Sequence, residues 1–121
     1  MPAMLAQLVD GVIVHRFELK KGFVTIGRKP DNDIVIQDTA VSGAHAHIIV
    51  ETNKDFEQYL DVYIEDFGST NGTYVNDLPV SKKHKLVHND LVKIGFNEFK
   101  FLDDDNADMT RTMHIPTPDI D

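Results

Sequence analysis

Three short clusters of polar residues and glycines carry the groups with which a protein can bind an anion. They lie at residues 27–33, 41–46 and 66–76, and together they supply a guanidinium, several hydroxyls, an amide and glycine backbone. An arginine offers a planar fork of donors, a hydroxyl donates a single hydrogen bond, and glycines let backbone N–H groups approach a ligand closely. This set of groups can hold a phosphate dianion without a metal ion.

Each cluster adjoins a segment whose alternating apolar and polar residues predict a β-strand. Val24 and Ile26 precede the first cluster, residues 46–50 follow the second, and residues 60–64 precede the third. A period of two is the spacing of side chains along one face of a strand. No window of helical length carries apolar residues at helical spacing, so the sequence predicts an all-β chain.

Turn-forming pairs separate these segments. Asp10-Gly11 lies between two apolar stretches and predicts a tight hairpin, because glycine accepts the positive φ that such a turn requires. Further turn signals occur at residues 21–22, 30–32, 68–69, 71–72 and 76–77. Many short strands without intervening helices favour a two-sheet β-sandwich of short antiparallel strands.

Length and composition limit the function classes. A chain of 121 residues suits one domain, and 41% hydrophobic with 26% charged residues is typical of a globular protein. The absence of cysteine excludes disulfides, thiolate metal sites and a cysteine nucleophile. No stretch is apolar enough to span a membrane and no signal peptide is predicted, so we expect a cytoplasmic protein without a membrane partner.

The charge distribution separates a folded domain from a tail. The net charge of −8 argues against nucleic acid as a partner, because binding to a phosphate backbone needs a basic face. From residue 103 onward there are six acids and one base, which leaves −3 for residues 1–102. We therefore predict a folded domain at residues 4–102 and a flexible acidic tail at residues 103–121.

The three clusters, in this order, resemble the forkhead-associated (FHA) domain family. The match consists of Gly27-Arg28, a Ser-x-x-His motif at residues 42–45, and Gly-Ser-Thr-Asn-Gly-Thr-x-Val-Asn at residues 68–76. It covers roughly residues 5–102. The resemblance implies a β-sandwich whose loops at one end bind phosphothreonine peptides, in a signalling adaptor that acts with a Ser/Thr kinase or its substrate.

The resemblance also implies a role for each motif residue. Arg28 and Ser42 would contact the phosphate, Thr70 would line the phosphothreonine pocket, and Asn71 would hold the peptide backbone. His45 is similar to a buried residue that braces the loops by hydrogen bonds. Structural support would come from the remaining motif positions, which are Gly27, Gly68, Ser69, Gly72 and Asn76.

The chain departs from the family's pattern at the residue after Ser42, which is commonly Arg, Lys or Asn and here is Gly43. Only its backbone N–H remains to contact the phosphate, so we expect a competent pocket of reduced affinity. One hydrogen bond to a charged group contributes about 1.5–3 kcal/mol, or roughly a tenfold to hundredfold difference in affinity. Lys29 or a lysine at residues 82–83 would be the compensating cation.

Two other site classes use residues from the same clusters. An enzyme would pair Ser42 with His45 and an acid such as Asp66, but the strand–turn–helix elbow that activates a serine is not predicted. A metal site would use His45 and His47 with a third histidine, His84 or His88, yet no carboxylate or cysteine spacing supports it. We predict no catalytic residue, no metal and no cofactor.

The tail carries two further features. Residues 103–108 are similar to the start of a calcium-binding loop but lack the glycine required at the sixth position. Thr110 and Thr112 are candidate phosphorylation sites that would then provide a ligand for an FHA pocket; a merely solvating tail is the alternative. The alternative for the domain itself is a phosphate-independent interaction scaffold with the same fold, which Gly43 favours.

Overall fold

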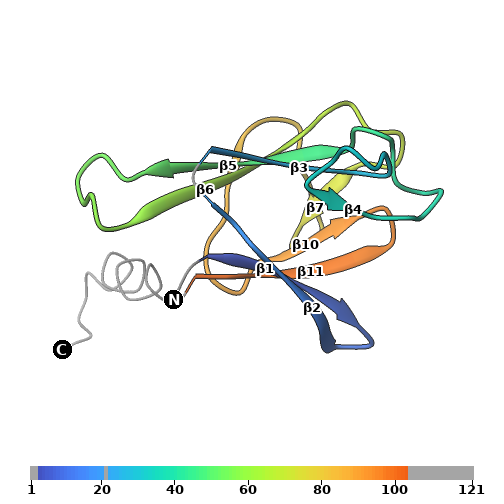
Figure 1. Cartoon of the computed structure of the whole chain (residues 1–121), viewed down its shortest axis with the longest axis horizontal. Helices are drawn as coiled ribbons and strands as arrows, with labels where there is room; N and C mark the ends of the chain where they lie inside the picture. Colours follow the sequence, from blue (N-terminus) through green and yellow to red (C-terminus); the bar gives the residue numbers. More distant parts are fainter. Residues whose placement is uncertain (1–2, 21, 104–121) are drawn as a thin grey trace.

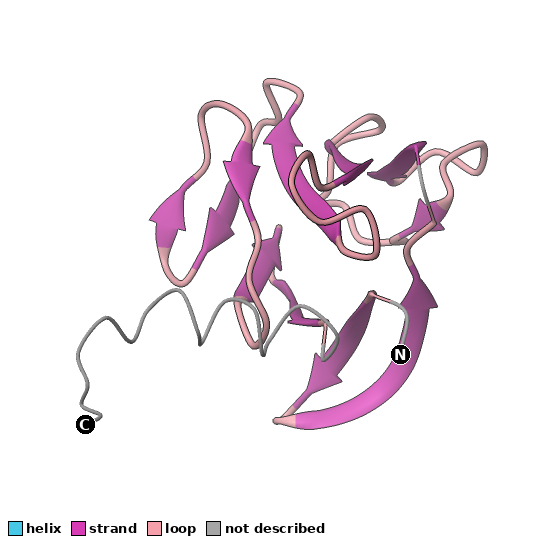
Figure 2. Ribbon diagram, turned by 90° about the vertical axis from the view of Figure 1, so that its left-hand side faces the viewer, coloured by secondary structure: helices cyan, strands magenta, loops and turns pink. Residues whose placement is uncertain are grey.

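The computed structural model describes residues 3–20 and 22–103 of the chain. Strands and loops make up this part of the molecule, and it contains no helix, as Figure 2 shows. Residues 3–20 and 22–103 thus hold no helix of the length and apolarity that a membrane span requires. The predicted acidic tail, with Thr110 and Thr112, lies almost entirely outside the described residues.

The described residues form eleven strands. In chain order they are β1 (Met4–Val9), β2 (Val12–Glu18), β3 (Gly22–Gly27), β4 (Ile34–Val35), β5 (Ala46–Thr52), β6 (Leu60–Asp66), β7 (Thr73–Val75), β8 (Leu78–Pro79), β9 (His84–Lys85), β10 (Leu91–Ile94) and β11 (Asn97–Leu102).

The strands form two sheets that pack face to face (Figure 1). One sheet has the order β2-β1-β11-β10-β7-β8, and the other has the order β4-β3-β5-β6-β9. Neighbouring strands are antiparallel except for β3 and β4, which pair in parallel through Ile26 and Ile34. The predicted two-sheet sandwich is therefore confirmed.

Two tight hairpins follow from short sequence signals. Asp10 and Gly11, at φ values of 53° and 78°, join β1 to β2. Asn76 and Asp77, at 50° and 71°, join β7 to β8 in the same way. Two successive residues at positive φ are typical of a type I′ turn, whose twist matches that of the flanking strands.

The core lies between the sheets and consists of the apolar residues that alternate along the strands. Phe99 and Phe101 of β11 are fully buried, and they belong to the same core cluster as the fully buried Ile26, Ile48 and Ile64 of the facing sheet. Burial of such side chains contributes about 1.5–3 kcal/mol each relative to their exposure. This core makes the sandwich a rigid support for the loops at its ends.

His47 is an exception to the alternation, because it lies on the outer face of β5 and is nevertheless buried. The rings of Phe23 and Phe67 lie 5.5 and 4.3 Å from its ring centroid, and its Nε2 is 3.1 Å from a carboxylate oxygen of Glu65. The alternating pattern by itself predicts an exposed polar side chain here. Aromatic residues from neighbouring segments cover it instead.

Strand register brings the three clusters to one end of the sandwich. Ile26, near the end of β3, pairs with Ala46 at the start of β5, and Ala46 pairs in turn with Asp66 at the end of β6. The loops that follow β3, precede β5 and follow β6 therefore meet, at the right-hand end in Figure 1.

Ala3 and Asp103, one residue beyond either end of the predicted domain, are also buried.

Candidate functional site

Backbone hydrogen bonds extend the β3–β5 pairing into the first two loops. The N–H of Arg28 donates to Ser42 O at 3.0 Å, and the N–H of Lys29 donates to Gly43 O at 3.3 Å. The side-chain amide of Asn32 donates to Lys29 O at 2.9 Å and to Gly43 O at 2.8 Å. The loop that carries Arg28 and the loop that carries Ser42 are thus held together as one surface.

Gly27 permits this close approach. A Cβ at Gly27 would lie 2.2 Å from Gly43 O and 2.7 Å from the side-chain nitrogen of Asn32. Both distances are far below van der Waals contact, and one of the two atoms belongs to the backbone. Glycine is therefore required here by the approach of the second loop.

His45 joins the second loop to the third. Its side chain is fully buried, and its Nδ1 accepts a hydrogen bond from the backbone N–H of Ser42 at 3.0 Å. Because Nδ1 is the acceptor, Nε2 carries the proton of the neutral ring and donates to Gly72 O at 2.9 Å. The imidazole therefore bridges two backbone segments that flank the candidate ligand position.

The third loop is organised around the carboxylate of Asp66. This carboxylate accepts hydrogen bonds from the Ser69 N–H at 2.9 Å, the Ser69 hydroxyl at 2.6 Å and the Thr73 hydroxyl at 2.7 Å. The Ser69 oxygen in turn accepts from the Gly72 N–H at 2.9 Å. Burial would raise the pKa of Asp66, but the hydrogen bonds from the Ser69 and Thr73 hydroxyls and from the Ser69 N–H outweigh burial and lower the pKa below its ordinary value. Asp66 thus remains ionised while it shapes the loop.

Arg28 and Ser42 present their remaining donors at this surface. The Nε of Arg28 donates to Val41 O at 3.0 Å, and its two terminal nitrogens have no partner among the described residues. The hydroxyl oxygen of Ser42 accepts a hydrogen bond from the Thr70 N–H at 3.0 Å. The hydroxyl proton of Ser42 has no acceptor within residues 3–20 and 22–103. A fixed guanidinium and a fixed hydroxyl are donors suited to an oxyanion.

Thr70 and Asn71 complete the set that the sequence places at the ligand. Both are exposed at the tip of the third loop, and the Asn71 amide donates to Ala40 O at 2.8 Å. The structure therefore brings Arg28, Ser42, Gly43, Thr70 and Asn71 to one end of the molecule. Asn76 lies elsewhere: its side chain bonds Asp90 at 2.9 Å and the Leu91 N–H at 3.0 Å and supports the β7–β8 turn.

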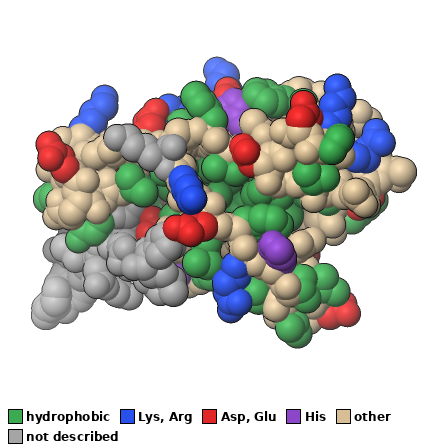
Figure 3. Space-filling view, viewed as in Figure 1, with side chains coloured by type: hydrophobic (Ala, Val, Ile, Leu, Met, Phe, Trp, Pro, Cys, Tyr) green, Lys and Arg blue, Asp and Glu red, His purple; other side chains and the backbone are tan. Residues whose placement is uncertain are grey.

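A shallow hollow of about 340 Å³ lies at these loops, lined by Arg28, Lys29, Pro30 and Gly43. Lys and Arg side chains project from the corresponding end of the molecule in Figure 3. Two cations at its wall make this hollow attractive to an anion, despite the negative net charge of the whole chain.

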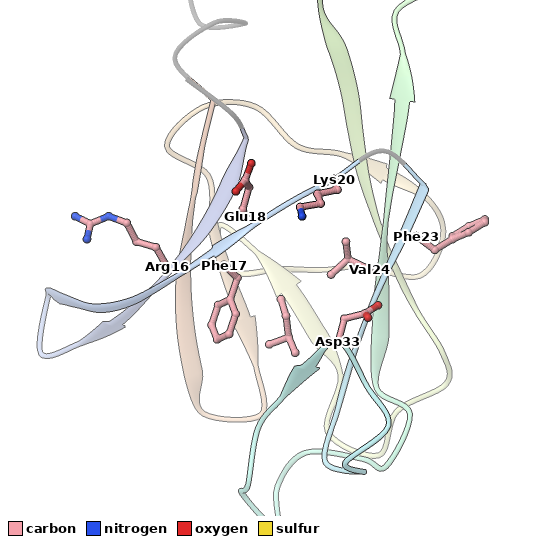
Figure 4. A pocket seen from close by; sticks show the side chains of 8 residues that line it. Arg16, Phe17, Glu18, Lys20, Phe23, Val24 and Asp33 are labelled. Carbon is pink, nitrogen blue, oxygen red and sulfur yellow. The ribbon is translucent and has the colours of Figure 1, made fainter.

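A larger groove of about 440 Å³ lies between the edge strand β2 and strands β3 and β4 (Figure 4). Arg16 and Lys20 line it together with Glu18 and Asp33, so its charges balance. The Asp33 carboxylate accepts hydrogen bonds from the Thr25 N–H and, at 3.3 Å, from the Thr25 hydroxyl. The groove is larger than the loop hollow, but acidic residues line it beside its cations, whereas the hollow is lined by Arg28 and Lys29 with no acidic residue.

The hydrogen bonds also bear on the enzyme and metal hypotheses. Both ring nitrogens of His45 are engaged by backbone groups, so the ring does not bond the Ser42 hydroxyl. Asp66 bonds Ser69 and Thr73 rather than orienting the imidazole as a catalytic acid would. Within residues 3–20 and 22–103, no three His, Asp or Glu side chains converge as a metal-binding group.

Two residues that organise the site were not recognised from the sequence in this role. From the sequence, Asn32 is part of a predicted turn, and Asp66 is only the acid of a hypothetical enzyme. Asn32 acts through a contact with the second loop. Asp66 acts along the third loop, whose path depends on Gly68 and Gly72 at positive φ. Their position within the first and third clusters is the sequence signal that could have pointed to them.

Comparison with known proteins agrees with this geometry. The family model described as the FHA domain matches residues 24–95. The glycogen accumulation regulator GarA of Mycobacterium tuberculosis is 39% identical over 87 residues, which is 72% of this chain and 49% of GarA. The chain thus spans about half the length of the curated relatives it matches first.

Solved structures show the same fold. One, from a structural and functional study of phosphothreonine-dependent FHA domain interactions, is 28% identical, with a TM-score of 0.71 and coverage of 85% of this chain and 97% of that one. Mycobacterium tuberculosis EmbR, solved in complex with a low-affinity phosphopeptide, is 29% identical with a TM-score of 0.69, covering 83% of this chain and 24% of EmbR. FHA domains are binding modules, and this chain belongs to the FHA domain family.

Proposed function

We propose that the chain is a phosphothreonine-recognition domain that binds its ligand across the three loops. Arg28 and Ser42 contact the phosphate, Gly43 offers its backbone N–H, Thr70 lines the pocket around the phosphothreonine, and Asn71 holds the peptide backbone. The role of the whole protein is that of a cytoplasmic signalling adaptor. Its partner is a phosphothreonine-containing protein, namely a Ser/Thr kinase or a substrate of such a kinase.

The arrangement of Arg28 is the observation that carries this proposal. Val41 O holds the Nε, while the terminal nitrogens have no carboxylate partner among the described residues. A guanidinium positioned in this way can donate two parallel hydrogen bonds to phosphate oxygens. Phosphorylation gives a threonine about −1.5 to −2 charges and three strong acceptor oxygens, which match these donors.

Relatives support the same class of ligand. The solved domain at 28% identity comes from work on phosphothreonine-dependent interactions, and EmbR was solved with a phosphopeptide. GarA is named a regulator, which agrees with an adaptor rather than an enzyme.

A library of phosphothreonine peptides, read by fluorescence anisotropy, tests the proposal. The selected peptide should bind, its unphosphorylated form should show no binding at concentrations where the phosphopeptide saturates, and the phosphoserine form should bind more weakly. Arg28→Ala should weaken binding by about 1.5–3 kcal/mol. Arg16→Ala is the matched control, because it removes an exposed arginine from the groove beside β2.

Two outcomes would contradict the proposal. Equal affinity for phosphorylated and unphosphorylated peptide would favour the phosphate-independent scaffold. Loss of binding in Arg16→Ala but not in Arg28→Ala would move the ligand from the loops to the groove beside β2.

A further inference from the structure

The space at Gly43 is occupied by a neighbouring side chain. A Cβ built at Gly43 would lie 3.0 Å from Cε of Lys29, 3.2 Å from its Cγ and 3.3 Å from its Cδ. The aliphatic part of Lys29 therefore lies along the glycine, in the position that a side chain at residue 43 would enter. Contacts of 3.0–3.3 Å are tighter than an ordinary van der Waals approach, so the two side chains compete for this space.

The backbone around this contact is fixed. The N–H of Lys29 donates to Gly43 O, and Asn32 bonds the carbonyl oxygens of both residues. Lys29 therefore lies next to Gly43 because of the loop geometry and independently of any ligand. Gly43 is not among the glycines at positive φ, so its backbone suits a residue with a side chain.

Lys29 also carries a positive charge that no carboxylate of the described residues neutralises. No acidic group in residues 3–20 and 22–103 lies within ion-pair distance of its ammonium. Lys83, by contrast, lies 3.5 Å from Glu51 and above the ring of Tyr63 on the outer face of the five-stranded sheet. Lys29 and Arg28 line the same hollow at the loops.

We propose that Lys29 is the second cationic ligand of the phosphate and takes the place of the side chain missing at residue 43. This inference rests on the proposed function of the site. Gly43 has two consequences in this arrangement: it removes one donor, and it gives the Lys29 chain room to extend beside Arg28. Lys29, in the first loop, thus compensates for the donor that is missing at residue 43. A lysine contributes a mobile point charge there rather than the planar fork of an arginine.

A first experiment isolates the charge of Lys29. Lys29→Gln keeps most of the aliphatic chain over Gly43 and removes the ammonium, so it should weaken binding of the selected phosphothreonine peptide about threefold to tenfold. The difference in peptide affinity between wild type and Lys29→Gln should shrink as the salt concentration rises, because the contact between the Lys29 ammonium and the phosphate is exposed and screened. Lys54→Gln is the matched control, since it removes an exposed ammonium from the segment between β5 and β6, at the opposite end of the sandwich from the three loops.

A second experiment tests the exchange between positions 29 and 43 by a double-mutant cycle. Gly43→Arg alone should change affinity less than about twofold, because the new side chain displaces Lys29 as it enters the site. In the Lys29→Ala background the same substitution should restore affinity to near the wild-type value. The two effects should therefore be strongly non-additive.

Each negative result is distinguishable. If wild-type protein binds no phosphothreonine peptide, or if Arg28→Ala binds normally, the proposed function fails. If Arg28→Ala weakens binding while Lys29→Gln binds like wild type, the function stands and the role of Lys29 is overturned. Additive effects in the cycle would show that residues 29 and 43 do not share one position at the phosphate.

Discussion

Nε2 of His45 lies 2.9 Å from the carbonyl oxygen of Gly72, and this hydrogen bond joins two loops that are distant in the sequence. The opposite ring nitrogen accepts from the N–H of Ser42, the residue whose hydroxyl faces the candidate ligand. This buried side chain therefore helps to fix the relative position of the second and third loops, together with the Thr70–Ser42 and Asn71–Ala40 hydrogen bonds. We therefore expect folding and the proposed ligand binding to depend on the same imidazole.

His45→Ala should consequently reduce both stability and binding. The substitution removes two hydrogen bonds from a fully buried position and leaves the Ser42 N–H and Gly72 O without partners. We expect the free energy of unfolding to fall by about 2–4 kcal/mol, measured by denaturant titration, and phosphopeptide affinity to fall with it. His84→Ala, at an exposed position on β9, should leave both unchanged. An unaltered unfolding curve for His45→Ala would refute its bracing role.

Ser42→Ala and Arg28→Ala should differ in their effect on stability. Each removes a charge-assisted contact to phosphate, so binding should weaken by about 1.5–3 kcal/mol in both variants. Ser42→Ala also removes the acceptor of the Thr70 N–H and should lower stability by about 1 kcal/mol. Arg28 is exposed, and its substitution removes one donor to Val41 O, a carbonyl that tolerates the loss better than an N–H would, so stability should change by less than about 0.5 kcal/mol. Calorimetric unfolding of both variants, beside peptide titrations, tests this separation, and equal stability losses would contradict it.

Gly27→Ala should disrupt the site without a change of charge. The added Cβ would meet Gly43 O at 2.2 Å, so the two loops must move apart and strain the hydrogen bonds that Asn32 makes between them. We expect a loss of about 2 kcal/mol or more in stability and a marked loss of affinity. Gly11→Asn is the control, because an asparagine tolerates positive φ and no atom lies near a Cβ at residue 11. Wild-type affinity in Gly27→Ala would mean that the spacing of the loops does not govern binding.

Local patterns predicted much of this fold. The Asp10-Gly11 hairpin depends on the conformational preference of two adjacent residues, and the strand segments depend on an alternation that a few residues define. Predicting that the three clusters converge required the family resemblance as well, because the alternating pattern does not say which residues of neighbouring strands pair. The contacts of Ile26 with Ala46 and of Ala46 with Asp66 supply that register.

Two of the missed features, the burial of His47 and the bridging role of Asn32, arise from contacts between segments that are distant in the sequence. His47 has a polar side chain on an outer face, yet Phe23 and Phe67 cover it. Asn32 is an ordinary turn residue in the sequence, but in the fold Gly43 lies beside it and its amide donates to the carbonyl oxygens of both Lys29 and Gly43. Neither contact is encoded in neighbouring residues, so neither could be predicted from spacing or composition.

Asp66 should make the stability of the domain depend on pH in the acidic range. Although burial raises the pKa of this carboxyl, hydrogen bonds from the Ser69 hydroxyl, the Thr73 hydroxyl and the Ser69 N–H lower it below its ordinary value overall. Because the folded-state pKa is depressed, the unfolded chain binds more protons as the pH falls. The stabilisation from Asp66 is therefore fully present above the unfolded pKa of about 3.9 and is lost as the pH falls through the folded pKa.

The comparison of wild type with Asp66→Asn measures this contribution directly, because titration of the other carboxyls is common to both proteins. At about pH 6, Asp66→Asn should be less stable by about 1–3 kcal/mol, since the amide is a weaker acceptor for the Ser69 and Thr73 donors. The difference should narrow progressively as the pH is lowered toward about 3 and below. Asp10→Asn, at the exposed β1–β2 turn, should show no such narrowing. A difference between wild type and Asp66→Asn that stays constant or widens on acidification would show that Asp66 does not act on the third loop as an ionised acceptor.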